Sequence, residues 1–207
     1  MNHGKATVFM GIRAFRIRPG GSAYLASMTT SRRTSLALAA TSLLCLPAIS
    51  LAEVSPISDI PDNQAFVVQS GAGYSLKVPD GWSRTGAAAR TTFSDKYNTI
   101  SIETRPSAKP PTTASVTKTE LPTLAKRAGF QRGTVTKQTR PAGTAILITY
   151  RALSAPLAVT GKRVLNDVER YEFWKAGRLA VLTLQAPKGS DNVDPWKVVT
   201  TSFAWKR

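Results

Sequence analysis

The stretch RVLNDVERYEFWKAGRLAVLTLQA, residues 163–186, decides the fold of this chain. Its two runs are separated by Lys175-Ala176-Gly177-Arg178, a tight hairpin turn in which Gly177 can adopt a positive φ. The first run mixes polar and apolar residues, whereas the second, residues 179–186, is almost wholly apolar. A strand that is apolar on both faces is typically buried on both faces. We therefore predict an antiparallel hairpin whose second strand lies at the centre of a sheet, with a layer on each side.

Further strands are predicted on both sides of this hairpin, from β-branched and aromatic runs bounded by turn residues. They cover residues 65–69, 74–78, 91–93, 98–104, 133–139 and 144–152. Gly71 and Gly73 separate the first two runs and indicate a second hairpin. Pro79-Asp80-Gly81 predicts a turn, because proline fixes φ and glycine allows a positive φ. The chain is therefore rich in antiparallel strands.

Two helices are predicted among these strands. Residues 116–128 carry apolar side chains at helical spacing, with charged residues on the opposite face. Pro122 leaves open a second start for this helix, near Glu120. Residues 195–201 form the other helix, in which Asp194 acts as N-cap and a proline occupies the first helical position.

Three motifs carry a resemblance to a known family. They are the run Tyr74-Ser-Leu-Lys-Val-Pro-Asp-Gly-Trp82, the hairpin over residues 171–186, and the ending Asp194-Pro-Trp-Lys-Val-Val-Thr-Thr-Ser-Phe203. Together they resemble PsbP-like domains over residues 65–205, and residues 167–205 are most similar to uncharacterised bacterial exported members. The resemblance implies an α+β fold, an α/β/α sandwich with a central antiparallel sheet. It also implies non-enzymatic accessory roles, which in photosynthetic members include docking on photosystem II and, in some, metal binding.

The first 52 residues are predicted to be a targeting region. Thr34 to Ala52 carries no charge, its apolar centre has the length of a signal-peptide h-region, and Arg32-Arg33 precedes it. Ser50 and Ala52 are small residues that suit cleavage before Glu53. The region contains no acidic residue and six basic ones: Lys5, Arg13, Arg16, Arg18, Arg32 and Arg33. We expect export to the periplasm or the extracellular space, by either the general or the twin-arginine route.

Residues 1–27 admit two interpretations. Met28 begins a compact signal of ordinary length, so translation could start there. Alternatively, the upstream part is an organellar transit peptide, which would place the protein in a thylakoid lumen. Both a bacterial and a plastid host therefore stay open.

The remaining residues are predicted to form a mobile leader, residues 53–64, and one PsbP-like domain, residues 65–207. The whole chain has 207 residues and a formal net charge of +16; beyond residue 52, 22 basic and 12 acidic residues leave +10. The only histidine and cysteine, His3 and Cys45, lie in the targeting region. The domain thus has no imidazole base, thiol nucleophile or Cys/His zinc site. The metal-binding histidines of photosynthetic relatives have no counterpart, so we expect no metal, no cofactor and no catalytic residue.

Paired carboxylates offer the remaining route to catalysis. Glu169 and Glu172 lie three apart on a strand and therefore point to opposite faces. Asp167 and Glu169 share a face, and we expect them to form cross-strand ion pairs with arginines such as Arg163 and Arg170. The oxygen-rich loop 189–194 lacks the spacing of a calcium loop and is predicted to cap the last helix.

The basic stretch from Lys118 to Arg140 is the candidate binding surface. It holds one acidic residue, Glu120, and six basic ones: Lys118, Lys126, Arg127, Arg132, Lys137 and Arg140. Such a surface favours an anionic membrane surface or an acidic envelope protein as partner. We expect no nucleic acid, because an exported protein rarely meets it, and we expect a monomer. The alternative is a small-ligand-binding domain, with an apolar pocket lined by Tyr150 or Trp174.

Overall fold

The structure is a computed structural model of the chain, and it describes residues 58–87, 89–157 and 160–206. The predicted targeting region, residues 1–52, lies outside the described residues, as do the first five residues of the predicted leader. Within the described ranges, no helix is long and apolar enough to cross a membrane.

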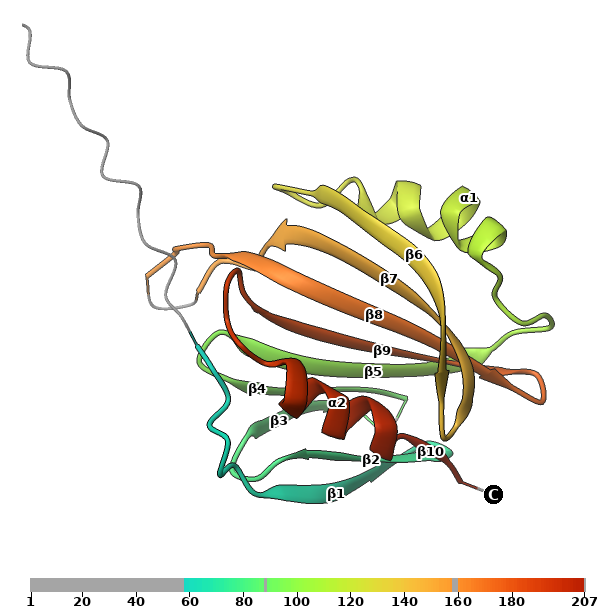
Figure 1. Ribbon diagram of the computed structural model, residues 1–207, viewed down its shortest axis with the longest axis horizontal. Helices are drawn as coiled ribbons and strands as arrows, with labels where there is room; N and C mark the ends of the chain where they lie inside the picture. Colours follow the sequence, from blue (N-terminus) through green and yellow to red (C-terminus); the bar gives the residue numbers. More distant parts are fainter. Residues whose placement is uncertain (1–57, 88, 158–159, 207) are drawn as a thin grey trace, which may run out of the picture. The chain divides into compact units, whose positions relative to one another are not determined.

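A seven-stranded antiparallel sheet forms the centre of the fold (Figure 1). Its strand order is β3-β4-β5-β9-β8-β7-β6. The bounds are β3 Ser83–Ala87, β4 Arg90–Asp95, β5 Asn98–Pro106, β6 Gln131–Arg140, β7 Gly143–Leu153, β8 Leu165–Lys175 and β9 Arg178–Pro187.

The hairpin predicted from residues 163–186 is confirmed as β8 and β9. Ala176 and Gly177 connect the strands with φ of 46° and 80°, the two positive values that a tight hairpin turn requires. Strand β9 lies between β5 and β8, and it has no exposed residue. Leu182 and Leu184 on one face are 0% exposed, and Val181 on the other is 4% exposed. The apolar run therefore predicted both the central place of β9 and the layers on its two sides.

One face of the central sheet is covered by a three-stranded sheet and by helix α2. The small sheet has the order β1-β2-β10, with β1 Phe66–Gly71, β2 Tyr74–Pro79 and β10 Ala204–Trp205. Phe203, which follows α2, stacks on Tyr74 of β2 and on Phe173 of β8 in the central sheet, and the ring centroids of the two phenylalanines are 4.6 Å apart. The predicted β1–β2 hairpin is confirmed, but its separation from the central sheet was not predicted.

The other face is covered by helix α1, Thr113–Leu124. Val116, Leu121 and Leu124 pack on β7 and β8 there. The predicted range of 116–128 is wrong at both ends. Thr112 and Ser115 form a capping box that starts the helix three residues earlier. Pro122 is accommodated inside the last turn, and the helix ends two residues beyond it.

Helix α2, Val193–Ser202, also begins earlier than predicted. Its N-cap residue is Asn192, and Asp194 lies in the first turn instead. The Asn192 side chain is engaged elsewhere: its Oδ1 accepts a hydrogen bond of 2.7 Å from the backbone N–H of Ile60. Ile60 belongs to the segment expected as a mobile leader, but it is 4% exposed and packs in the hydrophobic core on the α2 side of the sheet.

Strand β3 was not predicted at all. All five of its residues are exposed, so their sequence lacks the apolar alternation that reveals a half-buried strand. The fold class is nevertheless the predicted one: an α+β fold with a central antiparallel sheet and a helix on each face.

Candidate functional site

Four of the six predicted basic residues lie on the α1 side of the central sheet. Lys118 is on α1, Lys126 follows it, and Arg132 and Lys137 are on β6, the strand against which α1 packs. Arg132 pairs in register with Tyr150 and Lys137 with Ile146, and both partners pack under α1. Residues directly opposite in a ladder share a face, so both basic side chains face the α1 side. We call these four residues the basic face.

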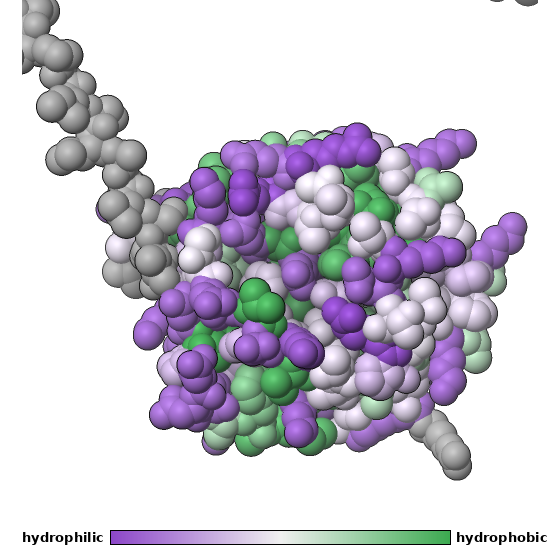
Figure 2. All heavy atoms as spheres, viewed as in Figure 1, coloured by the Kyte–Doolittle hydropathy of each residue, from purple (hydrophilic) through white to green (hydrophobic). Residues whose placement is uncertain are grey.

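The basic face carries uncompensated charge. All four residues are exposed. In the described part of the chain, none of their side chains makes a hydrogen bond or an ion pair. Figure 2 shows hydrophilic residues along the upper edge of the view, where α1 lies in Figure 1. The exposed large hydrophobic residues lie elsewhere, on β1 and α2: Val68, Val193 and Val198.

The other two predicted residues are not part of this surface. Arg127 is half-buried: its Nη1 donates to the Tyr150 hydroxyl at 2.8 Å, and its Nη2 donates to Gln185 Oε1 at 3.3 Å. Arg140 lies on the opposite face of the sheet, where its Nη2 donates to the Tyr171 hydroxyl at 3.2 Å. Both arginines are therefore tied to the sheet, and the structure does not bring the six residues together.

Arginines neutralise the acidic residues on the α1 side. Glu120 of α1 accepts from Arg105 Nη2 at 3.3 Å and from Arg170 Nη2 at 3.1 Å. Arg170 Nε also donates to Glu172 Oε1, at 3.4 Å. Glu172 is 2% exposed, and burial raises the pKa of its carboxyl above the ordinary value, although the charge of Arg170 opposes the shift. Because these acids are already paired with Arg105 and Arg170, the described residues provide no counter-charge for the basic face.

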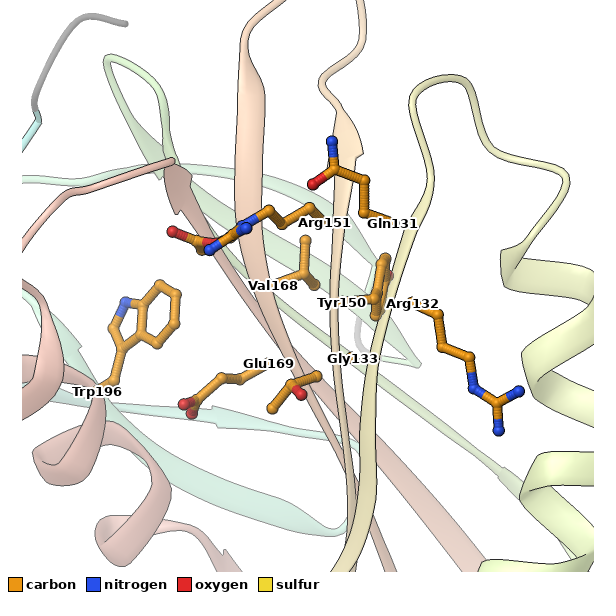
Figure 3. Close-up of a pocket in the computed structure, with 10 residues that line it drawn as sticks. Gln131, Arg132, Gly133, Tyr150, Arg151, Val168, Glu169 and Trp196 are labelled. Atoms are coloured by element: carbon orange, nitrogen blue, oxygen red, sulfur yellow. The ribbon is translucent and has the colours of Figure 1, made fainter.

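A groove lies on the opposite side of the central sheet, between β8 and α2. It consists of two adjoining cavities of about 370 Å³ and about 250 Å³, which share Asp167, Glu169 and Trp196 as lining residues. We call the two cavities together the α2 groove. In Figure 3, Trp196, Glu169 and Arg151 point into the same space, whereas Arg132 extends away from it.

Hydrogen bonds fix the carboxylates of the α2 groove. Arg151 Nε donates to Asp167 Oδ1 at 2.6 Å, and the backbone N–H of Gly189 donates to Asp167 Oδ2 at 3.2 Å. The Tyr171 hydroxyl donates to Glu169 Oε2 at 2.8 Å. Burial and the Glu169 carboxylate raise the pKa of Tyr171 to about 12, so its hydroxyl keeps its proton and stays a donor. The expected cross-strand ion pair of Asp167 exists, but its partner is Arg151.

The described residues contain no group of three or more His, Cys, Asp or Glu side chains positioned to hold a metal ion. Polar groups of the loop 189–194 bond to the segment before β1, since the Asp191 N–H donates to Asp59 Oδ1 at 2.8 Å and Ser190 Oγ accepts from the Ser58 N–H. Glu169 and Glu172 lie on opposite faces of β8, as their spacing predicted.

Sequence reasoning missed the α2 groove. The spacing of Asp167 and Glu169 did place both carboxylates on one face of a strand. The approach of Trp196 depends on how α2 packs against the sheet, and nothing in the local sequence reports that packing. The pocket expected beside Tyr150 or Trp174 is only partly matched. Tyr150 lines the larger cavity, although its ring packs under α1 on the other side of the sheet, and Trp174 lines neither cavity of the groove.

Comparison with known proteins places the fold but not the function. No family model matches the chain, and no curated protein matches it. Among solved structures it is similar to the cyanobacterial PsbP (CyanoP) of Synechocystis sp. PCC 6803, with a TM-score of 0.50 and 13% identity, over 73% of this chain and 98% of that one. This likeness supports the PsbP-like fold that the sequence motifs suggested.

Two other structures are more distant. LpqN of Mycobacterium tuberculosis, involved in cell envelope biogenesis, matches with a TM-score of 0.41 and 16% identity, over 73% of this chain and 99% of that one. A protein of Bacteroides thetaiotaomicron VPI-5482 matches with a TM-score of 0.45 and 11% identity, over 70% of this chain. The present chain spans about half of the Bacteroides protein, 49% of its length.

Proposed function

We propose that the protein is an exported, non-enzymatic accessory protein that docks through its basic face on an anionic membrane surface of the cell envelope. The observation that carries this proposal is the uncompensated charge of Lys118, Lys126, Arg132 and Lys137, on the side of the sheet where the acids are already paired. A membrane suits this surface better than a ligand cavity, because the four charges are spread over a helix and an edge strand.

The strength of such docking can be estimated. A basic residue near an anionic membrane contributes about 1 kcal/mol, and the contribution falls off within a Debye length. Four residues therefore provide on the order of 4 kcal/mol, which gives weak, reversible and salt-sensitive binding. The large exposed hydrophobic residues lie on β1 and α2, so we expect no insertion into the bilayer from the basic face.

Charge reversal tests the proposal directly. The variant Lys118→Glu/Lys126→Glu/Lys137→Glu reverses three of the four charges of the basic face. It spares Arg127, whose guanidinium is bound to Tyr150 and Gln185. We expect it to lose at least about 3 kcal/mol, or on the order of a hundredfold in affinity, for vesicles that contain phosphatidylglycerol. Sedimentation of vesicles with the full-length protein, at low and at high salt, measures this loss.

A matched variant separates position from net charge. Lys77→Glu/Lys175→Glu/Lys188→Glu changes the net charge equally, and all three lysines are exposed and lie off the basic face. We expect this variant to bind vesicles nearly as well as the wild type. Equal losses in the two triple variants, or no binding to anionic vesicles by the wild type, would show that the basic face is not a membrane-docking surface. If the wild type bound an acidic envelope protein but no anionic vesicles, the membrane would also be rejected as the partner of the basic face.

The cellular setting is part of the same proposal. Export follows from the predicted signal in residues 1–52, and it would bring the basic face to the periplasmic or outer side of a membrane. In a photosynthetic host the same docking would take place in the thylakoid lumen, where a photosystem II-associated role becomes the natural alternative.

A further inference from the structure

The α2 groove has the size and the mixed lining of a small-ligand site, and it lies on the side of the sheet opposite to the basic face. Its larger cavity, about 370 Å³, falls in the usual range for such sites, and the adjoining one extends it along α2. The lining residues of the larger cavity come from β6, β7, β8 and α2, which are regular elements rather than loops, whereas Ser190 and Asn192 of the loop before α2 line the smaller one. Regular elements hold side chains in place, so little ordering is needed when a ligand binds.

Several polar groups of the groove lack partners. Glu169 uses Oε2 to accept from Tyr171, whereas its Oε1 makes no hydrogen bond within the described residues. Arg151 binds Asp167 through Nε and leaves both Nη groups free of protein partners in the same ranges. The Gln131 amide and the Trp196 indole N–H are likewise unbonded there. The groove therefore offers donors and acceptors together, beside an aromatic ring.

The charges of the groove nearly balance. Arg151 and Asp167 form an ion pair of 2.6 Å. Glu169 is offset by Arg140 and by Lys197 of α2, both of which line the smaller cavity. An anionic ligand would meet two carboxylates, and a cationic ligand would meet three basic side chains. Arg132 also lines the larger cavity, but its side chain extends away from it (Figure 3). A neutral polar ligand avoids both conflicts.

We propose that the α2 groove binds a short uncharged saccharide, because free donors and acceptors beside an aromatic ring match hydroxyl groups alternating with an apolar C–H face. Each hydroxyl can donate one hydrogen bond and accept others. A hydroxyl would donate to Glu169 Oε1, and its neighbours would accept from Arg151 Nη and the Gln131 amide. Trp196 provides the apolar wall.

The site binds its ligand without cleaving it. Both oxygens of Asp167 already accept hydrogen bonds, from Arg151 and from the Gly189 N–H. Hydrolysis of a glycosidic bond by two carboxyl groups requires one to act as acid and the other as base or nucleophile. Asp167 is committed to the protein, which leaves Glu169 without a second carboxyl group.

Calorimetric titration of the full-length protein tests the site. The probes are maltotriose, cellotriose and chitotriose, with glutamate as an anionic and spermidine as a cationic comparison. We expect saturable binding of at least one trisaccharide and weaker binding of both charged probes. Glu169→Gln should weaken that binding about tenfold, because hydrogen bonds to a carboxylate are about twice as strong as those to a neutral amide. Gln131→Ala, at an exposed position, should weaken it several-fold.

Two control variants complete the test. Glu103→Gln changes a partly exposed carboxylate on another strand and should leave trisaccharide affinity unchanged. The triple variant at Lys118, Lys126 and Lys137 should also bind the trisaccharide normally, which separates this site from membrane docking. Binding of no trisaccharide, preference for glutamate or spermidine, or equal affinity of the wild type and Glu169→Gln would overturn the proposal.

Discussion

At the residue scale, Glu172 shows how a charge can be buried on this sheet. It is 2% exposed, and Arg170 is its bonded cation, at 3.4 Å. Arg170 is also bound to Glu120, so one guanidinium serves two carboxylates. Desolvation outweighs this attraction and raises the pKa of Glu172, so the folded state holds this proton more tightly than the unfolded chain.

This shift makes stability depend on pH. The contribution of Glu172 is fully present below its ordinary pKa of 4.5, and it is lost as pH rises through the raised pKa of the folded state. Glu172→Gln keeps a neutral side chain at every pH. We therefore expect the free energy of unfolding of this variant to increase relative to that of wild type as the pH rises above 4.5 and through the raised pKa of the folded state. Urea unfolding across this range measures the difference.

The matched control for Glu172 is Glu103→Gln. Glu103 is 43% exposed in its side chain and lies 3.9 Å from Arg90. Its difference from wild type should stay nearly flat with pH, because an exposed pair is screened by solvent. If Glu172→Gln were equally flat, or lost stability as pH rises, then burial would not control the Glu172 proton.

At the element scale, helix α1 depends on its N-terminus. Thr112 Oγ1 accepts from the Ser115 backbone N–H at 3.0 Å, and Ser115 Oγ accepts from the Thr112 backbone N–H at 2.9 Å. These bonds satisfy two backbone donors that a helix start leaves unpaired. The first turn has no acidic residue, so the capping box is the main stabilising feature at this end of the helix.

Thr112→Ala should therefore lower the free energy of unfolding by about 1 kcal/mol, since it removes the cap acceptor. The control is Thr117→Ala, at an exposed position of the same helix where alanine has the higher helix propensity. Thermal or urea unfolding followed by circular dichroism compares the two. Similar stability of the two variants would mean that packing of Val116 and Leu121 fixes the helix without help from its cap.

Strand β6 shows a second element whose geometry needs a particular residue. Its register with β7 shifts between Arg132 and Val135, a bulge at the edge of the sheet. A Cβ at Gly133 would collide with the carbonyl oxygen of Thr149. Glycine thus permits the close approach of the two strands beside the larger cavity of the α2 groove.

At the scale of the whole molecule, the central sheet separates two kinds of surface. The α1 side presents the basic face, because its acids are paired with arginines. The α2 side carries the groove, in which charges of both signs are nearly balanced. One sheet can therefore hold a ligand on one side while the other side contacts a membrane.

Export is the prediction that concerns the whole chain. We expect the protein recovered from its host to begin at Glu53, because Ser50 and Ala52 suit cleavage after Ala52. Mass spectrometry of the intact protein measures this directly. A chain that begins at Met1 or Met28 would contradict cleavage, and with it the proposed delivery of the basic face to the envelope.

The elements with strong local signals were predictable. The hairpin of β8 and β9 followed from an apolar run and a glycine turn, and β5 from the alternation of Ile100 and Ile102. Strand β3 was missed because none of its residues is buried. Both helix starts were misplaced. Thr112 caps α1 through a reciprocal pair of bonds with Ser115, and α2 begins after Asn192, whose side chain bonds to Ile60 instead of capping the helix.

The sequence by itself determined the antiparallel sheet, its central strand, the absence of His and Cys chemistry beyond residue 52, and the excess of basic residues. These features are local or compositional, so periodicity and counting reveal them. The tertiary structure alone decided which charges stay free: it bound Arg127 to Tyr150, placed Arg140 on the opposite face and paired Glu120 with Arg170. It also brought Trp196 to Glu169, because packing of α2 on the sheet joins residues that are far apart in the chain.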